Sequence, residues 1–366
     1  MARGTGGQDL SDRRAATTSQ GPDSPTAKAA GGGDEQPAGR RYDGPKLALG
    51  VIRIGPALML IVVVLAMALL SPVFLSTRNL ANVLSQTAAI AVLALAQLLV
   101  IVTRGIDLSV GSVIALSAVV GALVFEAVPS GPLVVVAILA TGMAVGAING
   151  TVYVWGRLPH PFIVTLATLS IARGLALWLS GGQPRRGMPD VIQTVGGGSI
   201  GWLPYSTLLV GGLALAALVL TTRLVWGRWI YAVGGSREAA RRAAIPVNGV
   251  LISVYVLSGL AAGVAACITS GRLNAGSPTF GELAELDAIA AVVIGGASFL
   301  GGRGNVGNAL IGALMIGVIR NGMNLLDVDA FLQPIVIGMV ILVAVELDVV
   351  RGRFEERFRV LQAAGP

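Results

Sequence analysis

The chain alternates between long apolar runs and short polar breaks from about residue 50 to residue 350. Ten runs can be delimited, most of them close to the roughly 20 residues that a helix needs to cross a bilayer core. They lie at 51–70, 83–102, 110–128, 132–155, 162–179, 206–222, 249–269, 286–300, 305–321 and 331–347. The pattern predicts an all-α integral membrane protein, a polytopic bundle of about ten transmembrane helices.

Polar segments flank the apolar region. Residues 1–46 are rich in Gly, Ala, Ser, Pro and Asp, with seven basic and six acidic side chains, and such a composition cannot bury enough apolar surface to fold. We therefore expect a disordered cytosolic tail at 1–46, a transmembrane domain at 47–350 and a cytosolic tail at 351–366. Because the first apolar run follows a long polar tail that contains acids, no cleavable signal peptide is predicted.

The longest polar break, residues 223–248, divides the transmembrane domain. Gly234 and Gly235 interrupt the chain, and Ser236 suits a helix N-cap because its hydroxyl can accept from an unpaired backbone N–H. Glu238 falls in the first turn and can pair with the arginines three and four residues later, and Pro246 is expected to stop the helix. The segment predicts a short basic cytosolic helix that either docks another protein or lies on lipid headgroups. Its residues are Gly235, Ser236, Arg237, Glu238, Ala239, Ala240, Arg241 and Arg242.

Composition and charge narrow the class of protein. With 54% hydrophobic and 12% charged residues, the 366-residue chain is not a soluble globular protein. Its net charge of +7 does not indicate nucleic acid, because the basic residues are scattered between apolar runs. If the N-terminus is cytosolic and the runs alternate, 20 of the 26 basic residues fall on the cytosolic side, so both termini are expected there. Cys267, the only cysteine, excludes an intramolecular disulfide and a cysteine-based metal site, and no metal is expected.

The sequence also admits an internal repeat. A shift of 196 residues lays Val110-Gly111 on Val306-Gly307 and Gly121 on Gly317. Only a few identities support the alignment, so chance explains it as well. Transporters are often built from such repeats, with solute sites near interrupted helices.

Asp107, in GIDLSVGS at 105–112, is the carboxylate closest to apolar runs on both sides. A charged group at that depth is costly and is a functional candidate by default. The alternative is a residue at the membrane surface that caps the third helix through the N–H groups near Val110 and Gly111, and the nearby Arg104 favours the surface.

Glycines concentrate between residues 295 and 317. Those at 295–304 predict a broken or re-entrant helix, which is tolerated at membrane depth only under a cover of protein or in a cavity. Those at 307, 312 and 317 permit close helix packing. No phosphate-binding loop of the G-x-x-x-x-G-K-[ST] type occurs, so the chain is not expected to hydrolyse ATP. The acids Glu282, Glu285, Asp287, Asp327 and Asp329 are expected in short solvated loops on the outer side.

Four stretches resemble the permease subunits of bacterial ABC importers for monosaccharides, of the ribose, xylose and galactose type. They are GRWIYAVGGSREAARRAAIPV in the central loop, GIDLSVGS, VVIGGASFLGGRGNVGNALIGALMIGVIRNGMNLL at 292–326, and LPHPFIVTLATLSIARG at 158–174. His160 stands in the last of these where another residue is usual. Together the matches extend over roughly residues 50–350.

The resemblance implies a transport subunit, not an enzyme, in the bacterial cytoplasmic (inner) membrane, which imports a monosaccharide by alternating access. It implies that the helix at 235–242 is the coupling helix that docks on a separate ABC ATPase subunit. ATP and Mg belong to that subunit, and no cofactor is expected on this chain. A sugar-binding protein outside the cytoplasm and a second permease copy, forming a homodimer, are the other implied partners within the lipid bilayer.

Polar side chains near the apolar runs are candidates for the solute path, because asparagine offers both donors and acceptors to sugar hydroxyls. Hydroxyls such as those of Thr165, Thr168 and Ser170 also qualify, although they can bond to their own helix carbonyls instead. The predicted path residues are Asp107, Ser109, Asn149, Asn321 and Asn324.

An ion-coupled secondary transporter of a small polar solute is the alternative function. That mechanism usually requires acids buried within the spans. Of the 19 acids, only Asp107 and Glu126 approach the apolar runs. Uptake that survives an uncoupler at constant ATP would distinguish the two classes.

Overall fold

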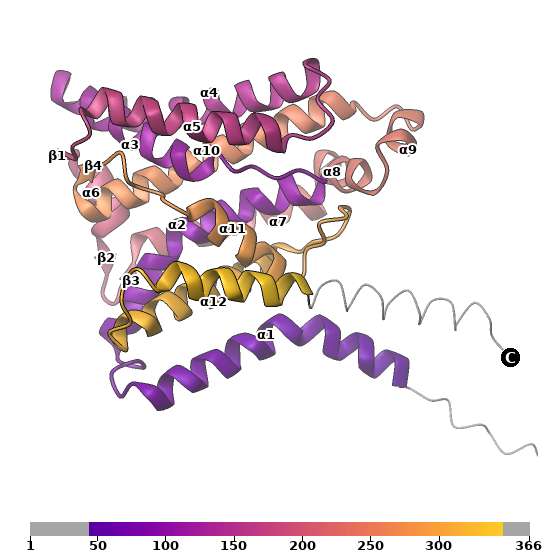
Figure 1. Cartoon of the computed structure of the whole chain (residues 1–366), viewed down its shortest axis with the longest axis horizontal. Coiled ribbons are helices and arrows are strands. Elements are labelled where there is room, and N and C mark those ends of the chain that lie inside the picture. Colours follow the sequence, from indigo (N-terminus) through magenta and orange to yellow (C-terminus); the bar gives the residue numbers. More distant parts are fainter. Residues whose placement is uncertain (1–43, 347–366) are drawn as a thin grey trace, which may run out of the picture. The chain divides into compact units, whose positions relative to one another are not determined.

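A computed structural model describes residues 44–346, with side chains described from Gly55 onward (Figure 1). The predicted tails at 1–46 and 351–366 lie outside the described residues, apart from 44–46 at the start of the first helix. The helices are α1 Gly44–Leu70, α2 Thr77–Val102, α3 Val110–Ala127, α4 Gly131–Trp155, α5 Phe162–Ser180, α6 Asp190–Gly197, α7 Tyr205–Thr222, α8 Val225–Gly235, α9 Arg237–Arg242, α10 Val247–Leu273, α11 Ala284–Ile294, α12 Val306–Leu325 and the unlabelled helix Gln333–Glu346.

Each of the ten predicted runs contains a helix, so the all-α polytopic class is confirmed. Within the described residues, α2, α3, α4, α5, α7, α10 and α12 are long and apolar enough to span a membrane, and Gly55–Leu70 and Gln333–Glu346 are shorter apolar helices. The run predicted at 286–300 is only partly helical, because α11 ends at Ile294 and an irregular segment continues to Asn305. This interruption agrees with the broken helix expected from the glycines.

The bundle formed by these helices has two distinct ends. α8 and α9 lie at one end (right in Figure 1), which we call the α9 end. α6 and two short antiparallel strand pairs, which the sequence did not predict, lie at the opposite end. One pair joins β1 (Arg185–Arg186) to β4 (Ala275–Gly276), and the other joins β2 (Ser199–Ile200) to β3 (Leu203–Pro204).

Burial separates the centre of the bundle from its lipid-facing rim. About 78% of the most apolar stretch of α2 is buried inside the protein, against 6% for α7. α2 is therefore central, and the outward side chains of α7 are apolar because their solvent is lipid. Trp155 near the α9 end and Trp178 near the opposite end are both strongly exposed, as expected for aromatic side chains at the two membrane interfaces.

Small residues allow α4 and α10 to approach closely. Gly142 and Gly146 of α4 face Gly259 of α10, and a Cβ at any of these three positions would overlap backbone of the other helix. Close backbone approach at small residues is the usual basis of helix association in lipid. Two of the three glycines predicted to pack tightly in α12 do so: Gly312 lies against Ala291 of α11, and Gly317 lies against Thr87 of α2. For Gly307 the prediction is wrong, because it is exposed and a Cβ there would meet only the side chain of Asn305, the cap of its own helix.

The segments aligned by the 196-residue shift have similar structures. α2 and α3 are joined by the irregular segment 103–109, and α11 and α12 are joined by the irregular segment 295–305. The second segment contacts the residue that precedes the first, because the N–H of Gly302 donates to the carbonyl of Val102, the last residue of α2, at 2.9 Å. The repeat stays a prediction, and this shared pattern is consistent with it.

Candidate functional site

The predicted coupling segment forms a short exposed helix. The Ser236 hydroxyl accepts from the N–H of Ala239 at 3.2 Å, as expected of an N-cap. Glu238 and Arg242 form the predicted ion pair at 2.6 Å. Ala240 is buried and Arg237 is half-buried, whereas the other four residues of α9 are exposed.

The prediction that Pro246 stops this helix is wrong. α9 already ends at Arg242, and Ala244 adopts the left-handed conformation with φ of 57°. The N–H of Ile245 then donates back to the carbonyl of Ala240 at 3.0 Å, which closes the end of the helix in the usual left-handed manner. Pro246 instead precedes α10 as its N-cap residue.

Asp107 is the centre of a buried hydrogen-bond network that joins four parts of the bundle. One carboxylate oxygen, Oδ1, accepts from the N–H and the hydroxyl of Ser109 at 3.0 and 2.6 Å. The other, Oδ2, accepts from the hydroxyl of Ser258 on α10 at 2.7 Å. Asn149 of α4 donates to the Ser109 hydroxyl at 2.9 Å and accepts from Thr168 of α5 at 2.6 Å. We call these five residues the Asp107 network.

The network lies within the bundle, and Asp107 accepts from the N–H of Ser109 and not from those of Val110 or Gly111, so the alternative of a cap on the third helix is wrong. Asp107, Ser109 and Asn149 are each 1% exposed. Asn149 lies six residues before the end of α4, or about 9 Å along its axis, and Ser258 lies eleven residues after the start of α10, or about 16 Å. The two oxygens of this buried carboxyl group are satisfied, because three hydroxyl and N–H groups donate to them.

Two tyrosines extend from the network toward α9. The rings of Tyr153 and Tyr255 meet edge to face with centroids 6.0 Å apart, and the guanidinium of Arg237 in α9 lies 5.6 Å from the centroid of the Tyr153 ring. Both hydroxyls are buried, and neither has a hydrogen-bond partner among the described residues. A cation over an aromatic face is attractive, so Arg237 links α9 to α4.

The other two predicted path residues lie elsewhere. Asn321 of α12 exchanges two hydrogen bonds of 2.9 Å with Asn79 of α2, and both side chains are buried. Asn324 is exposed and accepts from Gln333 at 2.8 Å. The structure therefore brings together Asp107, Ser109 and Asn149 but not Asn321 and Asn324.

Acids that were expected in solvated outer loops are partly buried. Asp287 is 3% exposed and is paired with Arg320, and Glu285 is 9% exposed. Both belong to the first turn of α11 and not to a loop. That part of the sequence-based interpretation is wrong, because an acid at a helix start can be enclosed by neighbouring spans. Asp327 and Asp329 are exposed as expected.

The sequence analysis missed several polar residues of the core. Ser258 was not singled out, because one serine in an apolar run of small residues is no signal by itself. Gln97 had a recognisable signal, as the one amide within the apolar stretch 88–102. Its side chain is fully buried, and neither amide atom has a partner among the described residues.

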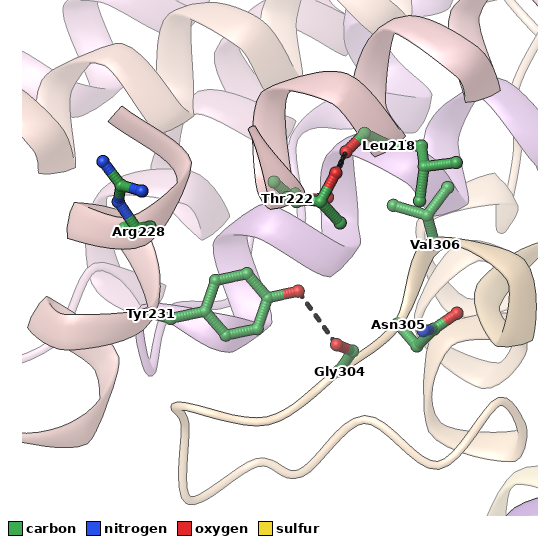
Figure 2. A pocket seen from close by; sticks show the side chains of 8 residues that line it. Leu218, Thr222, Arg228, Tyr231, Gly304, Asn305 and Val306 are labelled. Atoms are coloured by element: carbon green, nitrogen blue, oxygen red, sulfur yellow. Dashed lines mark hydrogen bonds between the residues drawn. The ribbon is translucent and has the colours of Figure 1, made fainter. Parts of the chain in front are cut away.

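A pocket of about 350 Å³ lies at the α9 end, between α7, α8 and the start of α12 (Figure 2). Burial raises the pKa of the Tyr231 phenol, which donates to the carbonyl of Gly304 at 2.8 Å. Thr222 donates to the carbonyl of Leu218, and the Asn305 side chain caps α12. The pocket shares no residue with the Asp107 network, and most of its polar side chains already have partners. Its lining residues are Leu218, Thr221, Thr222, Arg228, Tyr231, Gly304, Asn305 and Val306.

Comparisons with known proteins identify relatives over most of the chain. Residues 79–345 match the family described as the permease component of the branched-chain amino acid transport system. The ribose import permease protein of Escherichia coli (strain K12) is 41% identical over 293 residues, which cover 79% of this chain and 91% of the relative.

Two further relatives come from the same organism. The D-allose transport system permease protein is 37% identical over 81% of this chain and 91% of its own length. The xylose transport system permease protein is 34% identical over 75% of this chain and 86% of its own length. No solved structure matches the chain.

Proposed function

This chain belongs to the family described as the permease component of the branched-chain amino acid transport system, and on that premise we propose that it is the transmembrane subunit of an ABC importer for a monosaccharide. The observation that carries the proposal is the similarity to a ribose import permease over 91% of that protein's length. The family description names amino acids, but the relatives reported above are named for ribose, allose and xylose. We therefore favour a monosaccharide as the solute.

We infer that a separate ABC ATPase supplies the energy and docks on α9. α9 suits this role because it is exposed at one end of the bundle, carries charged side chains and has a small exposed residue, Ala239, where another protein can approach closely. ATP and Mg would then bind the ATPase and not this chain. Closure of the ATPase would move α9 and drive alternating access of the bundle.

The Asp107 network is the proposed part of the solute path within the bundle. Its carboxylate, amide and hydroxyl groups can exchange their mutual hydrogen bonds for bonds to sugar hydroxyls when the bundle opens. Asn321 is proposed as a second polar position on the path, and Asn324 as an exposed polar group near the end of α12. Brief contacts suffice for a path, because a separate binding protein would supply the affinity.

The remaining features of the assembly follow from the same proposal. The chain would be a multi-pass protein of the bacterial cytoplasmic membrane with both termini and α9 in the cytosol. A sugar-binding protein would then approach the opposite end, where α6 and the strand pairs lie. Two copies of the chain would form the transport unit.

Reconstituted transport tests the proposal. The chain, its ATPase and the sugar-binding protein of the same host are placed in liposomes, and uptake of labelled ribose, allose and xylose is measured with ATP inside or outside. We expect uptake of at least one sugar that depends on ATP on the α9 side and on the binding protein. Binding-protein-dependent uptake of leucine but of none of the sugars would contradict the proposed solute.

The ion-coupled alternative is favoured by one observation, the burial of Asp107 among the spans. Its carboxylate oxygens are already satisfied by Ser109 and Ser258, as a structural role would also require. Uptake at constant ATP with an uncoupler present separates the mechanisms. Full uptake supports the ATP-driven importer, and its loss supports ion coupling.

A further inference from the structure

Three chain segments meet in a tight contact directly before α9. They are the end of α2, the end of α8 and the irregular segment that follows α11. A Cβ on Gly234 would overlap the carbonyl of Val102, and a Cβ on Gly301 would overlap Arg104 and the carbonyl of Gly234. We call this contact the glycine junction, and its residues are Val102, Arg104, Gly234, Gly235, Gly301 and Gly302.

Arg104 holds the junction together through its guanidinium. Nε donates to the carbonyl of Gly234 at 2.7 Å, and Nη2 donates to the carbonyl of Gly235 at 2.6 Å. These carbonyls belong to the last two residues of α8, and Ser236, the N-cap of α9, follows at once. Hydrogen bonds from a charged donor are stronger than those between neutral groups. They fix the start of α9 to Arg104, which lies two positions after the end of α2.

A second contact reinforces the same connection. Arg237, the first residue of α9, donates from Nη2 to the carbonyl of Thr103 at 3.3 Å. Its guanidinium also lies over the ring of Tyr153. α9 is therefore held at its N-terminal end by residues 103 and 104, while its charged surface remains exposed.

The segment that receives these contacts leads directly into the Asp107 network. Only Gly105 and Ile106 separate Arg104 from Asp107, and the carbonyl of Ile106 accepts from the Thr165 hydroxyl of α5 at 3.2 Å. Gly105 is confined as well, because a Cβ there would overlap the Tyr255 hydroxyl. A segment this short and this closely packed cannot absorb a displacement of Arg104 without moving Asp107.

We propose that Arg104 is a positioning residue that transmits movement of α9 to the Asp107 network. The inference rests on the proposed function, in which an ATPase docks on α9. A displacement of α9 pulls the carbonyls of Gly234 and Gly235, these pull the Arg104 guanidinium, and the 103–107 segment then shifts against Ser258 and Asn149. The ATPase-driven step thereby exchanges hydrogen bonds at the buried carboxylate.

The backbone conformation of Arg104 indicates which substitution tests the contribution of its side chain. Arg104 has a φ of 64°, in the left-handed region that favours glycine. Arg104→Gly therefore accommodates the same local backbone and removes the guanidinium contacts. Arg104→Lys keeps the charge but cannot reach both carbonyls with a planar group. Arg228→Ala is the matched control, because Arg228 is exposed at the same end and its side chain forms no hydrogen bond or ion pair with other residues of the 44–346 region.

Hydrogen–deuterium exchange of the purified permease in lipid nanodiscs tests the contact without any partner. We expect Arg104→Gly to raise exchange at 234–242 and at 103–109 together, with Arg104→Lys intermediate and Arg228→Ala unchanged. Unchanged exchange at 103–109 in Arg104→Gly would overturn the connection.

The reconstituted transporter tests the transmission. We expect Arg104→Gly to retain the ATPase during purification and to hydrolyse ATP, while uptake falls about ten-fold or more, since each hydrogen bond from a charged donor is strong enough to change an equilibrium by about that factor. Wild-type uptake in Arg104→Gly, or loss of the bound ATPase, would overturn the role of Arg104. A wild-type chain without ATP-driven uptake would overturn the proposed function itself, whereas the exchange experiment still decides whether Arg104 connects α9 to the 103–109 segment.

Discussion

Arg320 Nη2 lies 2.7 Å from Asp287 Oδ2 and donates to Oδ1 at 2.8 Å, which joins the span α12 to the short helix α11. The Asp287 side chain is 5% exposed and the Arg320 side chain 31%. Asp287 lies in the first turn of α11, and Arg320 lies five residues before the end of α12. The pair thus connects the start of the short helix α11 to the long helix α12.

Loss of Asp287 should destabilise the bundle. Asp287→Ala leaves the Arg320 guanidinium without its counter-ion, and removal of one partner from a buried pair costs about 3 kcal/mol in free energy of unfolding. We expect a lower Tm for the purified protein in detergent. The double variant Asp287→Ala with Arg320→Ala should recover part of the loss, because no unpaired charge remains. A double variant as unstable as the sum of the two single variants would contradict an interaction between these residues.

The Asp107 network should be sensitive to one hydroxyl on α5. Thr168→Val keeps the shape of the side chain but leaves the buried Asn149 Oδ1 without its donor, which costs about 1–3 kcal/mol. We expect a lower Tm and slower sugar uptake, and Thr168→Ser should restore both in part. Thr141→Val is the control, because the Thr141 hydroxyl donates only to the carbonyl of Ala137 in its own helix. Equal effects of Thr168→Val and Thr141→Val on Tm and uptake would show that the hydrogen bond to Asn149 matters no more than a bond within one helix.

The cap of α9 should determine how well the coupling helix is formed. Ser236→Ala removes the acceptor for the N–H of Ala239 and should destabilise this six-residue helix by about 1 kcal/mol. Faster hydrogen–deuterium exchange at 237–242 and weaker retention of the ATPase are the expected results, and Ser236→Asp should retain the cap. Exchange in Ser236→Ala that matches the wild type would contradict a role for the cap.

Features set by neighbouring residues in the chain were predictable from the sequence. Ser236, Glu238 and the glycine pair before them lie within five positions, so the cap, the ion pair and the break at Gly235 could all be expected. The apolar runs predicted the helices for the same reason, since the length of a run reflects the thickness of the bilayer. Pro246 was misjudged because a left-handed Ala244 ends the helix first, and alanine gives no sequence signal for that conformation.

Features set by distant residues were not predictable. Buried Asp107 is bonded by Ser258, which lies 151 positions away, and buried Asp287 is paired with Arg320 in another span. From the sequence alone, the nearby Arg104 favoured a position of Asp107 at the membrane surface. In the structure Arg104 turns instead toward the carbonyls before α9, a contact across 130 positions that no periodicity reveals.

The close contact of α4 with α10 should respond to a single methyl group. Gly142→Ala would place a Cβ against the carbonyl of Gly259 and the N–H of Gly263, both backbone atoms that cannot move aside cheaply. We expect α4 and α10 to separate, with a lower Tm and a loss of uptake, because α4 and α10 both contribute donors to the Asp107 network. Gly211→Ala on α7 is the matched control.

A Cβ at Gly211 meets nothing within 4 Å, and alanine is favoured over glycine in a helix by about 0.5–1 kcal/mol. Gly211→Ala should therefore be neutral or slightly stabilising and should transport normally. If Gly142→Ala and Gly211→Ala had the same Tm, the spacing of α4 and α10 would not depend on Gly142. A side chain at this contact would then be tolerated. If Gly142→Ala kept its Tm but lost uptake, the contact would instead act in the moving step, where α4 and α10 must slide past each other.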